Sequence, residues 1–330
     1  MPRIFLTHPP LALRNYYGDK ALAGLRALGE VRCNPLEREL TMAELAEAVR
    51  GCDIVISYRQ TPGSAELLAA LPDAVAFSRC AIDIRNIDVA AASDLGILVT
   101  QASAGFVVSV AEWVVGALVD LSRGISAAAQ AYHAGQVPVA GMGRELRGAT
   151  LGVIGYGQIS RYLCGLGLAL GMRVLVSDPY AAVDDAAVTR CKLPHLLGQA
   201  DYVVCLAAAS EETENLMNDA RFALMRPGAF FINPSRGNLV DEAALTRALD
   251  SGRLAGCALD VGRAPDQMPT PGLARHPKVI ATPHVGGLTP QAIEHQALET
   301  VAQSASILRG EVPPGAVNAD RASRLARLKT

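Results

Sequence analysis

The sequence has almost no excess charge of either sign. Its 330 residues include 30 lysines and arginines and 32 aspartates and glutamates, so the formal net charge is −2. A protein that binds nucleic acid usually carries a basic patch or stripe, and this balance argues against such a partner. Four basic residues near the C-terminus have the spacing of one helix face, and we expect them to form a solvated tail. These residues are Arg321, Arg324, Arg327 and Lys329.

Long apolar runs and paired cysteine motifs are also missing. No stretch approaches the roughly 18 apolar residues that a helix needs to span a bilayer, and the N-terminus lacks the charged-then-apolar order of a signal peptide. The seven cysteines are scattered without a CxxC motif, so we expect reduced, buried thiols. These absences predict a cytoplasmic protein with no membrane partner.

Several catalytic patterns are absent as well. No group of His, Cys, Asp and Glu has the spacing of metal ligands, so we expect no metal site. No Gly-x-Ser-x-Gly elbow occurs, and no Walker lysine follows the glycines that begin at Gly155. The chemistry is therefore expected to proceed without a metal.

The residues that are present predict two α/β domains. Half of the residues are hydrophobic, and the length suggests two domains. Strand-like and helix-like patterns alternate from the N-terminus onward, as in domains built on parallel sheets. The expected strands are 4–6, 31–33, 53–57, 75–78, 97–100, 151–154, 173–177, 202–206, 229–233, 255–260 and 279–281. The expected helices include 21–28, 42–50, 64–71, 106–121, 242–251 and 290–308, with caps at Thr41 and Asp241.

The most informative segment lies in the middle of the chain, where the strand-like run 151–154 meets two glycines and a helix pattern. Gly155 permits a tight turn, and Gly157 lets the backbone approach a pyrophosphate. The helix opens at Gln158 and Ile159, whose N–H groups can bind the phosphates. This order predicts a dinucleotide site, although a glycine turn inside an ordinary βαβ unit would look similar.

Two further features support the dinucleotide prediction. Ser160 stands where the third glycine of the fingerprint is usual, and a small residue suffices for close packing there. Asp178 follows the next strand-like run and can accept a hydrogen bond from a ribose 2′-hydroxyl. No arginine stands close to Asp178 in the sequence, and a 2′-phosphate would meet a like charge. NAD(H) is therefore favoured over NADP(H).

Three other polar residues follow expected strands, and ligands bind at the carboxyl edge of such sheets. Arg236 can form a fork to a carboxylate and polarise a carbonyl group, unless it is a surface arginine on a turn. Asp260 can accept a hydrogen bond from a carboxamide or a ribose, or simply cap a turn. His284 precedes two glycines and can exchange a proton with a carbonyl oxygen, unless it is structural.

Together these segments resemble the D-isomer-specific 2-hydroxyacid dehydrogenases over nearly the whole chain. The matching segments are 86–88, 110–112, 155–160, 178–179, 235–237, 258–261 and 282–287. The resemblance implies two doubly wound parallel-sheet domains, with a Rossmann NAD-binding domain inserted into a flavodoxin-like catalytic domain. The implied bounds are 1–101 with 288–330 for the catalytic domain and 102–287 for the NAD-binding domain. A cleft, a closing hinge motion and a homodimer built partly on the apolar connector at 102–123 are also implied.

The resemblance assigns roles to residues. Arg236 is expected to clamp the carboxylate and keto oxygen of the substrate, and His284 to act as general acid and base. With NAD(H), the two would interconvert a 2-keto acid and a D-2-hydroxy acid, because their charges stabilise the developing alkoxide. The implied cofactor-binding set is Gly155, Gly157, Gln158, Ile159, Asp178, Pro234, Ser235, Asp260, Gly286 and Gly287.

The chain departs from the family pattern beside the histidine. The family has a glutamate, paired with the histidine, five residues after the aspartate that matches Asp260, and this chain has Pro265 there. One hypothesis is that the neighbouring Asp266 acts as the catalytic partner and reaches His284, because a nearby carboxylate raises the pKa of a histidine. The other hypothesis is that His284 works unpaired.

The loop expected to hold the substrate carboxylate also differs. The family usually has glycines where Ala81 and Asp83 stand. Asp83 either points inward, which would disfavour a second acidic group on the substrate, or pairs with Arg79 or Arg85. Arg59 ends an expected strand and can line the same cleft. The expected substrate-binding set is Arg59, Ala81, Ile82 and Asp83.

Other functions remain open at this stage. The missing glutamate fits a relative that acts on another small anion, such as formate or phosphite, and phosphoglycerate oxidation is possible too. It also fits a non-catalytic NAD(H)-sensing scaffold, as in the corepressor relatives of the family. The retained Arg236 and His284 favour an enzyme over a scaffold.

Overall fold

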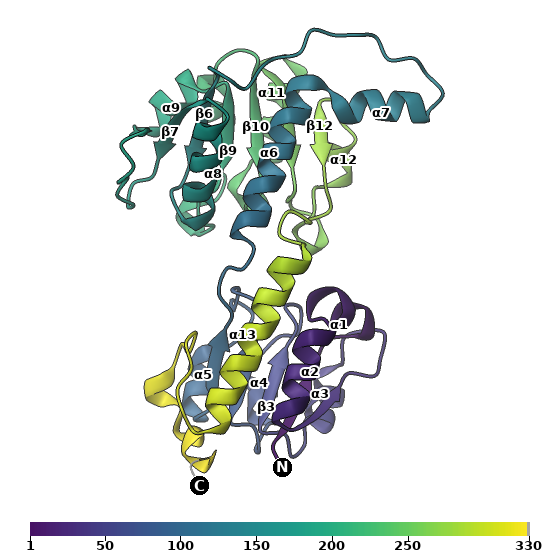
Figure 1. Ribbon diagram of the computed structural model, residues 1–330, viewed down its shortest axis with the longest axis vertical. Helices are drawn as coiled ribbons and strands as arrows, with labels where there is room; N and C mark the ends of the chain where they lie inside the picture. The colour runs from purple at the N-terminus through teal and green to yellow at the C-terminus, as the bar shows by residue number, and fades with distance from the viewer. Residues whose placement is uncertain (329–330) are drawn as a thin grey trace. The chain divides into compact units, whose positions relative to one another are not determined.

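The computed structural model describes residues 1–328. The chain divides into two compact units (Figure 1). The first holds the residues up to 106 together with those from 290 onward, and the second holds 107–289. No helix in the described part of the chain is long and apolar enough to cross a membrane.

The first unit contains a five-stranded parallel sheet with the order β2-β1-β3-β4-β5, which is the flavodoxin-like order. Its strands are β1 (Arg3–Leu6), β2 (Glu30–Cys33), β3 (Ile54–Ser57), β4 (Ala76–Arg79) and β5 (Leu98–Gln101). Its α-helices are α1 (Pro10–Tyr16), α2 (Asp19–Leu28), α3 (Met42–Ala48), α4 (Ala65–Ala69), α5 (Val89–Asp94) and α13 (Pro290–Leu308).

Alternate residues of β1 point to opposite faces of this sheet and join two different cores. Ile4 and Leu6 share one core with Leu25 of α2 and Ile307 of α13. Phe5 belongs to the other core, which is built with α3, α4 and α5. The strands are apolar on both faces because helices cover both faces of the sheet.

The second unit contains a seven-stranded parallel sheet with the order β12-β11-β10-β9-β6-β7-β8. Its strands are β6 (Thr150–Ile154), β7 (Arg173–Ser177), β8 (Val188–Arg190), β9 (Tyr202–Cys205), β10 (Ala229–Asn233), β11 (Leu254–Leu259) and β12 (Val279–Ala281). Its α-helices are α6 (Val107–Arg123), α7 (Ile125–His133), α8 (Gln158–Ala169), α9 (Leu193–Gln199), α10 (Asp219–Leu224), α11 (Glu242–Asp250) and α12 (Pro271–Ala274). Read from β6, this is the Rossmann order with one further edge strand.

The predicted fold class is confirmed, since both sheets are parallel and doubly wound. Every expected strand is present, with each end within one residue of its predicted position. The capping box at Thr41 and the cap at Asp241 are confirmed as well, through hydrogen bonds from the amides of Glu44 and Ala244. The sequence did not predict α1, which begins at a proline without a side-chain cap, or the three-residue strand β8.

The prediction of a solvated C-terminal tail holds for the side chains of Arg321 and Arg327, which are exposed, and is wrong for Arg324. Residues Ser323–Leu328 form a 3₁₀ helix in which Leu325 is buried against the first unit. Arg324 donates hydrogen bonds to the carbonyl oxygens of Leu71 and Ala74, at 2.6 and 2.9 Å. Arg324 therefore fastens the tail to the loop between α4 and β4. Lys329 lies outside the described residues.

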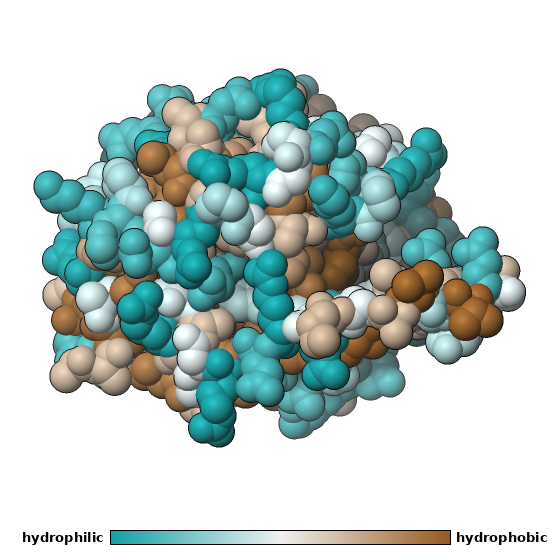
Figure 2. Space-filling view, turned by 90° about the horizontal axis from the view of Figure 1, so that it is seen from above, coloured by the Kyte–Doolittle hydropathy of each residue, from teal (hydrophilic) through white to brown (hydrophobic). Residues whose placement is uncertain are grey.

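The segment around α7 exposes large apolar side chains. Helix α7 and the loop after it extend away from the sheet of the second unit, and brown side chains gather there at the right of Figure 2. From α6 to the loop after α7, the exposed large apolar residues are Val108, Val119, Ile125, Tyr132, Val137, Val139 and Met142. Exposing an apolar patch of this kind to water is unfavourable, and such patches are typical of interaction sites.

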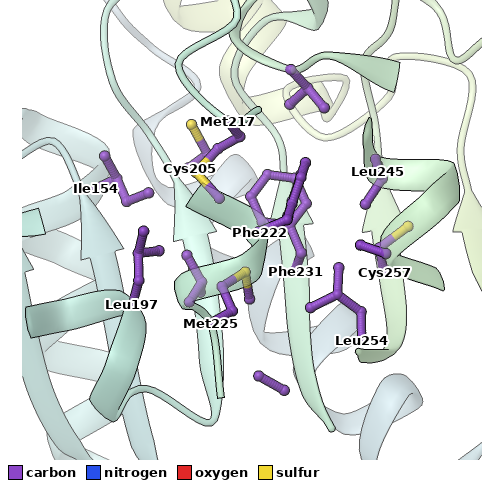
Figure 3. Close-up of a cluster of buried hydrophobic side chains, with 14 of the residues drawn as sticks. Ile154, Leu197, Cys205, Met217, Phe222, Met225, Phe231, Leu245, Leu254 and Cys257 are labelled. Atoms are coloured by element: carbon purple, nitrogen blue, oxygen red, sulfur yellow. The ribbon is translucent and has the colours of Figure 1, made fainter. Parts of the chain in front are cut away.

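The core under α9, α10 and α11 supports the loops at one end of the second sheet. Phe222 of α10 meets Phe231 of β10 edge to face, with 5.3 Å between ring centroids (Figure 3). Met217 and Leu245 belong to the same buried cluster. These contacts hold β10 and β11, and therefore the residues that follow them, in fixed positions.

We predict that Asn318→Ala destabilises the first unit by about 1–3 kcal/mol, because the substitution leaves buried backbone groups unpaired. Asn318 is buried, accepts a hydrogen bond from the amide of Val99 at 2.8 Å and donates to the carbonyl oxygen of Ile97 at 2.9 Å. Urea unfolding measures the loss, and amide exchange should quicken in β5. The exposed Asn15→Ala is the control, and equal midpoints for the two variants would contradict the prediction.

Candidate functional site

The glycine turn of the second unit lies where the strand order reverses. β6 has β9 on one side and β7 on the other, and doubly wound sheets bind ligands at the carboxyl end of this junction. Gly155 follows β6 with a φ of +91°. A Cβ atom at Gly155 would lie 2.7 Å from the carbonyl oxygen of Leu206. Both the backbone conformation and this neighbour require glycine.

The start of α8 is open to a ligand. Gly157 is the N-cap, and no side chain caps the helix, so the amides of Gln158 and Ile159 are available. A Cβ atom at Gly157 would meet nothing within 4 Å. Ser160 is buried, as close packing at the third glycine position demands. These residues fit the pyrophosphate of a dinucleotide.

Asp178 directly follows β7, and the main chain holds its carboxylate. One oxygen accepts hydrogen bonds from the amides of Tyr180 and Ala181, both at 2.8 Å, and the other accepts one from Tyr156 at 2.7 Å. Partial burial acts to raise the pKa of Asp178, but these hydrogen bonds outweigh it, and the pKa lies below its usual value. The carboxylate is therefore ionised and fixed beside the glycine turn.

An arginine that is distant in the sequence, Arg190, lies close to Asp178 in the structure. β8 pairs with β7, and this register places Arg190 beside Val176. The Nη2 of Arg190 donates to the carbonyl oxygens of Asp178 and Pro179, at 2.9 and 3.3 Å. This contact could not be predicted from the sequence, because β8 is only three residues long and has no clear strand pattern.

Asn233 closes the turn that presents Arg236. Its side chain accepts a hydrogen bond from the amide of Ser235 at 3.1 Å and donates to the carbonyl oxygen of Arg236 at 2.9 Å. Pro234 is buried, and the Ser235 hydroxyl donates to the carbonyl oxygen of Ala207 at 3.0 Å. Arg236 is half-buried, and its Nη1 donates to the carbonyl oxygen of Ser235 at 2.8 Å. The role of Asn233 was not predicted from the sequence, although Asn-Pro is a turn signal.

The loops after β10 and β11 touch through their backbones. A Cβ atom at Gly237 would overlap the backbone of Gly262, so glycine is required at this contact. Arg263, also missed by the sequence analysis, joins the same loops to the segment before α10. Its Nη2 donates to side-chain oxygens of Glu214 and Asn215, at 2.8 and 2.6 Å. Arg236 therefore stands on a rigid support.

Asp260 follows β11, is 2% exposed, and organises the next loop. One carboxylate oxygen accepts hydrogen bonds from the Thr282 hydroxyl at 2.6 Å and the Val285 amide at 2.8 Å, and the other accepts one from the Gly286 amide at 2.7 Å. A Cβ atom at Gly286 would lie 2.8 Å from that second oxygen. Gly287, next in the chain, is half-buried. Asp260 therefore caps the turn that carries His284, and its contact with a carboxamide or ribose stays a prediction.

His284 lies in the loop after β12, in the left-handed conformation with a φ of +56°. Its amide donates to the carbonyl oxygen of Asp260 at 2.9 Å. The Nδ1 atom lies 2.9 Å from the carbonyl oxygen of Asp266. A carbonyl oxygen can only accept, so Nδ1 carries the hydrogen. The Nε2 atom is therefore the one that can give or take a proton.

The hypothesis that the Asp266 carboxylate is the catalytic partner stays a prediction, whereas one contact between Asp266 and His284 is clear. It is made by the main-chain carbonyl of Asp266, in the short 3₁₀ turn Pro265–Gln267. Asp266 and Gln267 both have positive φ angles, +57° and +58°, and this path directs the carbonyl toward the imidazole ring. Backbone angles of this kind are not readable from the residue types alone.

The substrate-binding candidates Arg59, Ala81, Ile82 and Asp83 lie in the first unit, after strands β3 and β4. The guanidinium of Arg59 lies over the ring of Tyr16, 5.2 Å from its centroid. The amides of Ala81 and Ile82 have no hydrogen-bond acceptor within residues 1–328. Backbone N–H groups at such a position suit an anionic ligand.

Asp83 pairs with Arg85, as one of the two alternatives anticipated. The Nε of Arg85 lies 2.9 Å from one carboxylate oxygen, and its Nη2 lies 2.6 Å from the other. This hydrogen bonding raises the pKa of Arg85. The pairing offsets the negative charge that Asp83 brings to the loop.

Comparisons with known proteins agree with this geometry. The family model described as "D-isomer specific 2-hydroxyacid dehydrogenase, NAD binding domain" matches residues 115–286. An (S)-sulfolactate dehydrogenase from Chromohalobacter salexigens is 38% identical over 264 residues, covering 78% of this chain and 85% of its own length. A chloroplastic D-3-phosphoglycerate dehydrogenase from Arabidopsis thaliana is 31% identical over 316 residues, which is 94% of this chain and 53% of the relative. The chain thus spans about half the length of the phosphoglycerate dehydrogenases it matches.

A solved structure from Polaromonas sp., described as a member of the same family, has the same fold. Its TM-score is 0.88 at 23% identity, with 96% of this chain and 99% of that chain covered. The glycine turn, the open start of α8 and the ionised Asp178 lie within the matched NAD-binding segment, so this unit holds a nicotinamide dinucleotide. With this cofactor site and relatives that cover most of its length, the chain belongs to the D-isomer specific 2-hydroxyacid dehydrogenases, oxidoreductases that interconvert 2-keto and 2-hydroxy acids.

Proposed function

We propose that Arg236 and His284 are the pair that carries out this reaction. The observation that carries the proposal is the hydrogen bond between His284 Nδ1 and the carbonyl oxygen of Asp266, which leaves Nε2 as the exchangeable position. Arg236 and His284 follow β10 and β12, and β11 lies between these strands. Asp260 links the two segments, because its amide donates to Asn233 and its carbonyl accepts from His284.

The proposed roles follow from the chemistry of the two side chains. When bound, the nicotinamide supplies the hydride for reduction and accepts it in oxidation. Arg236 holds the substrate carboxylate with its planar fork and polarises the keto oxygen. The Nε2 of His284 donates a proton to that oxygen as negative charge develops there, and takes the hydroxyl proton in the reverse direction.

We assign the substrate to the first unit, with the expected domain bounds 1–101 and 288–330, and the cofactor to 102–287. The amides of Ala81 and Ile82 would hold the substrate carboxylate. Asp83 pairs with Arg85, which offsets its charge, so it no longer argues against a second acidic group on the substrate. The name of the sulfolactate relative points the same way. A 2-keto acid with a second anionic group, such as 3-sulfopyruvate, is therefore our preferred substrate.

We further propose a homodimer built on the connector region 102–123 and on α7 with the loop that follows it. The exposed side chains of this region, among them Val139 and Met142, support an interface that a second copy covers. We also propose a cytoplasmic location, since all seven cysteines are free thiols.

The reaction can be tested by following the loss of NADH with a panel of 2-keto acids. The panel holds glyoxylate, pyruvate, hydroxypyruvate, 3-sulfopyruvate, and branched and aromatic members. We expect turnover, and we expect Arg236→Gln to lower kcat/KM by about 10²–10³-fold through the lost fork. Arg226→Gln is the control, because Arg226 pairs with Asp201 at the amino ends of the strands. Tight NADH binding without turnover of any member would instead favour the NAD(H)-sensing scaffold.

Substitutions at Asp266 separate its main chain from its side chain. Asn and Gly tolerate the left-handed conformation at this position, whereas a β-branched residue does not. We expect Asp266→Asn and Asp266→Gly to keep most of the reductase activity and Asp266→Val to lose about 10–100-fold, because the carbonyl would leave His284. Steady-state rates across a pH series measure this. A loss in Asp266→Asn as large as in Asp266→Val would show that the carboxylate is the working group.

The cofactor preference can be tested at Asp178 and Arg190. We expect the wild-type enzyme to favour NADH strongly, because Asp178 would repel a 2′-phosphate. In Asp178→Ala, the kcat/KM with NADH divided by the kcat/KM with NADPH should fall about tenfold or more. The guanidinium of Arg190 would then face the 2′-phosphate of NADPH without a competing carboxylate. Adding Arg190→Ala should remove the gain in NADPH use, while Arg190→Ala alone serves as the control. An unchanged ratio in Asp178→Ala would refute this account of specificity.

A further inference from the structure

Arg79 is a buried cation at the carboxyl end of β4, directly before the loop that carries Ala81 and Ile82. Its side chain is fully buried, with 0% exposure. The guanidinium donates hydrogen bonds to the carbonyl oxygens of Tyr58 and Thr61, the latter at 3.0 Å, and to the side-chain oxygen of Asn86. No carboxylate is among its hydrogen-bond partners in the described part of the chain. A buried charge without an ion-pair partner is costly to the folded state.

The contacts of Arg79 join the two segments that carry the substrate-binding candidates. Tyr58 and Thr61 flank Arg59 on the segment after β3. Asn86 ends the loop after β4, and its side-chain nitrogen donates to the carbonyl oxygen of Arg59 at 3.1 Å. One guanidinium therefore fixes the position of the Arg59 backbone and of the loop that begins at Cys80.

The hydrogen-bond acceptors of Arg79 are all neutral, and the nearby carboxylates of Asp83 and Glu39 offset its charge only from a distance. Burial and the charge of Arg79 lower the pKa of His8 to about 3, so this imidazole is neutral. Burial raises the pKa of the Cys80 thiol to about 12, so it is neutral too. Asp83 is held by Arg85. Glu39, whose pKa burial raises, accepts a hydrogen bond from the Thr61 hydroxyl at 2.8 Å rather than one from Arg79.

We propose that Arg79 is a positioning residue whose buried charge makes the amides of Ala81 and Ile82 an anion site, while its hydrogen bonds hold Arg59 beside that site. The inference rests on the proposed function, in which this loop receives the substrate carboxylate. Arg79 acts from beneath the loop and never touches the substrate, because its side chain has no exposed surface. Its field reaches an anion at the loop through a protein interior that screens charge poorly.

Two substitutions separate the charge from the hydrogen bonds. Arg79→Gln removes the charge, whereas Arg79→Lys keeps a charge that burial makes titratable, because desolvation lowers the pKa of a buried lysine. Arg324→Gln is a matched control in the same unit. Arg324 also donates to two carbonyl oxygens, those of Leu71 and Ala74, but at the amino end of β4.

The measurements are KM and kcat for the best 2-keto acid from about pH 6 to about pH 10. We expect Arg79→Gln to raise KM about tenfold or more at every pH, with a smaller change in kcat and an unchanged Kd for NADH. Arg79→Lys should show a KM near the wild-type value at low pH that rises as the lysine loses its proton. Arg324→Gln should follow the wild-type curve. A purely structural role would give the same loss in both variants at all pH values.

Binding of oxamate, an unreactive analogue of a 2-keto acid, provides a readout that does not depend on turnover. Calorimetry with NADH present should show weaker oxamate binding in Arg79→Gln and a pH-dependent loss in Arg79→Lys. Should Arg79→Gln fail to fold, the Arg79→Lys series carries the test. Wild-type turnover together with a KM in Arg79→Gln within about twofold of wild type would overturn this inference and leave the proposed function intact. A wild-type protein that neither turns over a 2-keto acid nor binds oxamate would overturn both.

Discussion

The second unit depends on one buried carboxylate, that of Asp260. Its two oxygens accept three hydrogen bonds from the loop that carries His284, and its main chain is bonded to Asn233 on one side and His284 on the other. A buried carboxylate with its lone pairs so occupied is rigid, and losing any donor would leave a costly charge. These hydrogen bonds hold the loops after β10, β11 and β12 together at one edge of the sheet. They therefore fix the positions of Arg236 and His284, which lie in these loops.

The fold could be predicted from the sequence because its signals are local. Parallel strands covered on both faces are short apolar runs, and each such run became a strand within one residue of its expected ends. The glycine turn is local for the same reason, since Gly155 is required by a φ of +91° and by a neighbour that leaves no room for a side chain. The predicted role of Asp178, as an acceptor for a ribose hydroxyl, follows from its place at the end of β7.

The parts that the sequence did not predict depend on register and backbone angles. Arg190 reaches Asp178 only through the pairing of β8 with β7. The contact between Asp266 and His284 depends on consecutive positive φ angles, which residue types alone do not specify. Arg79 looked in the sequence like a possible partner for Asp83, whereas its hydrogen bonds go to two carbonyl oxygens after β3 and to the side chain of Asn86. Charges and acceptors that meet across strands are set by three-dimensional neighbours.

The partner of His284 has a consequence for how this site can change over time. A hydrogen bond from the imidazole to a main-chain carbonyl needs only the path of the chain at Asp266, not a particular side chain. Every amino acid carries that carbonyl, so the residue at this place is free to vary among those that accept a left-handed backbone. A hydrogen-bond partner supplied in this way leaves no signature in residue identity. Comparing side chains position by position would record only a missing glutamate at Pro265.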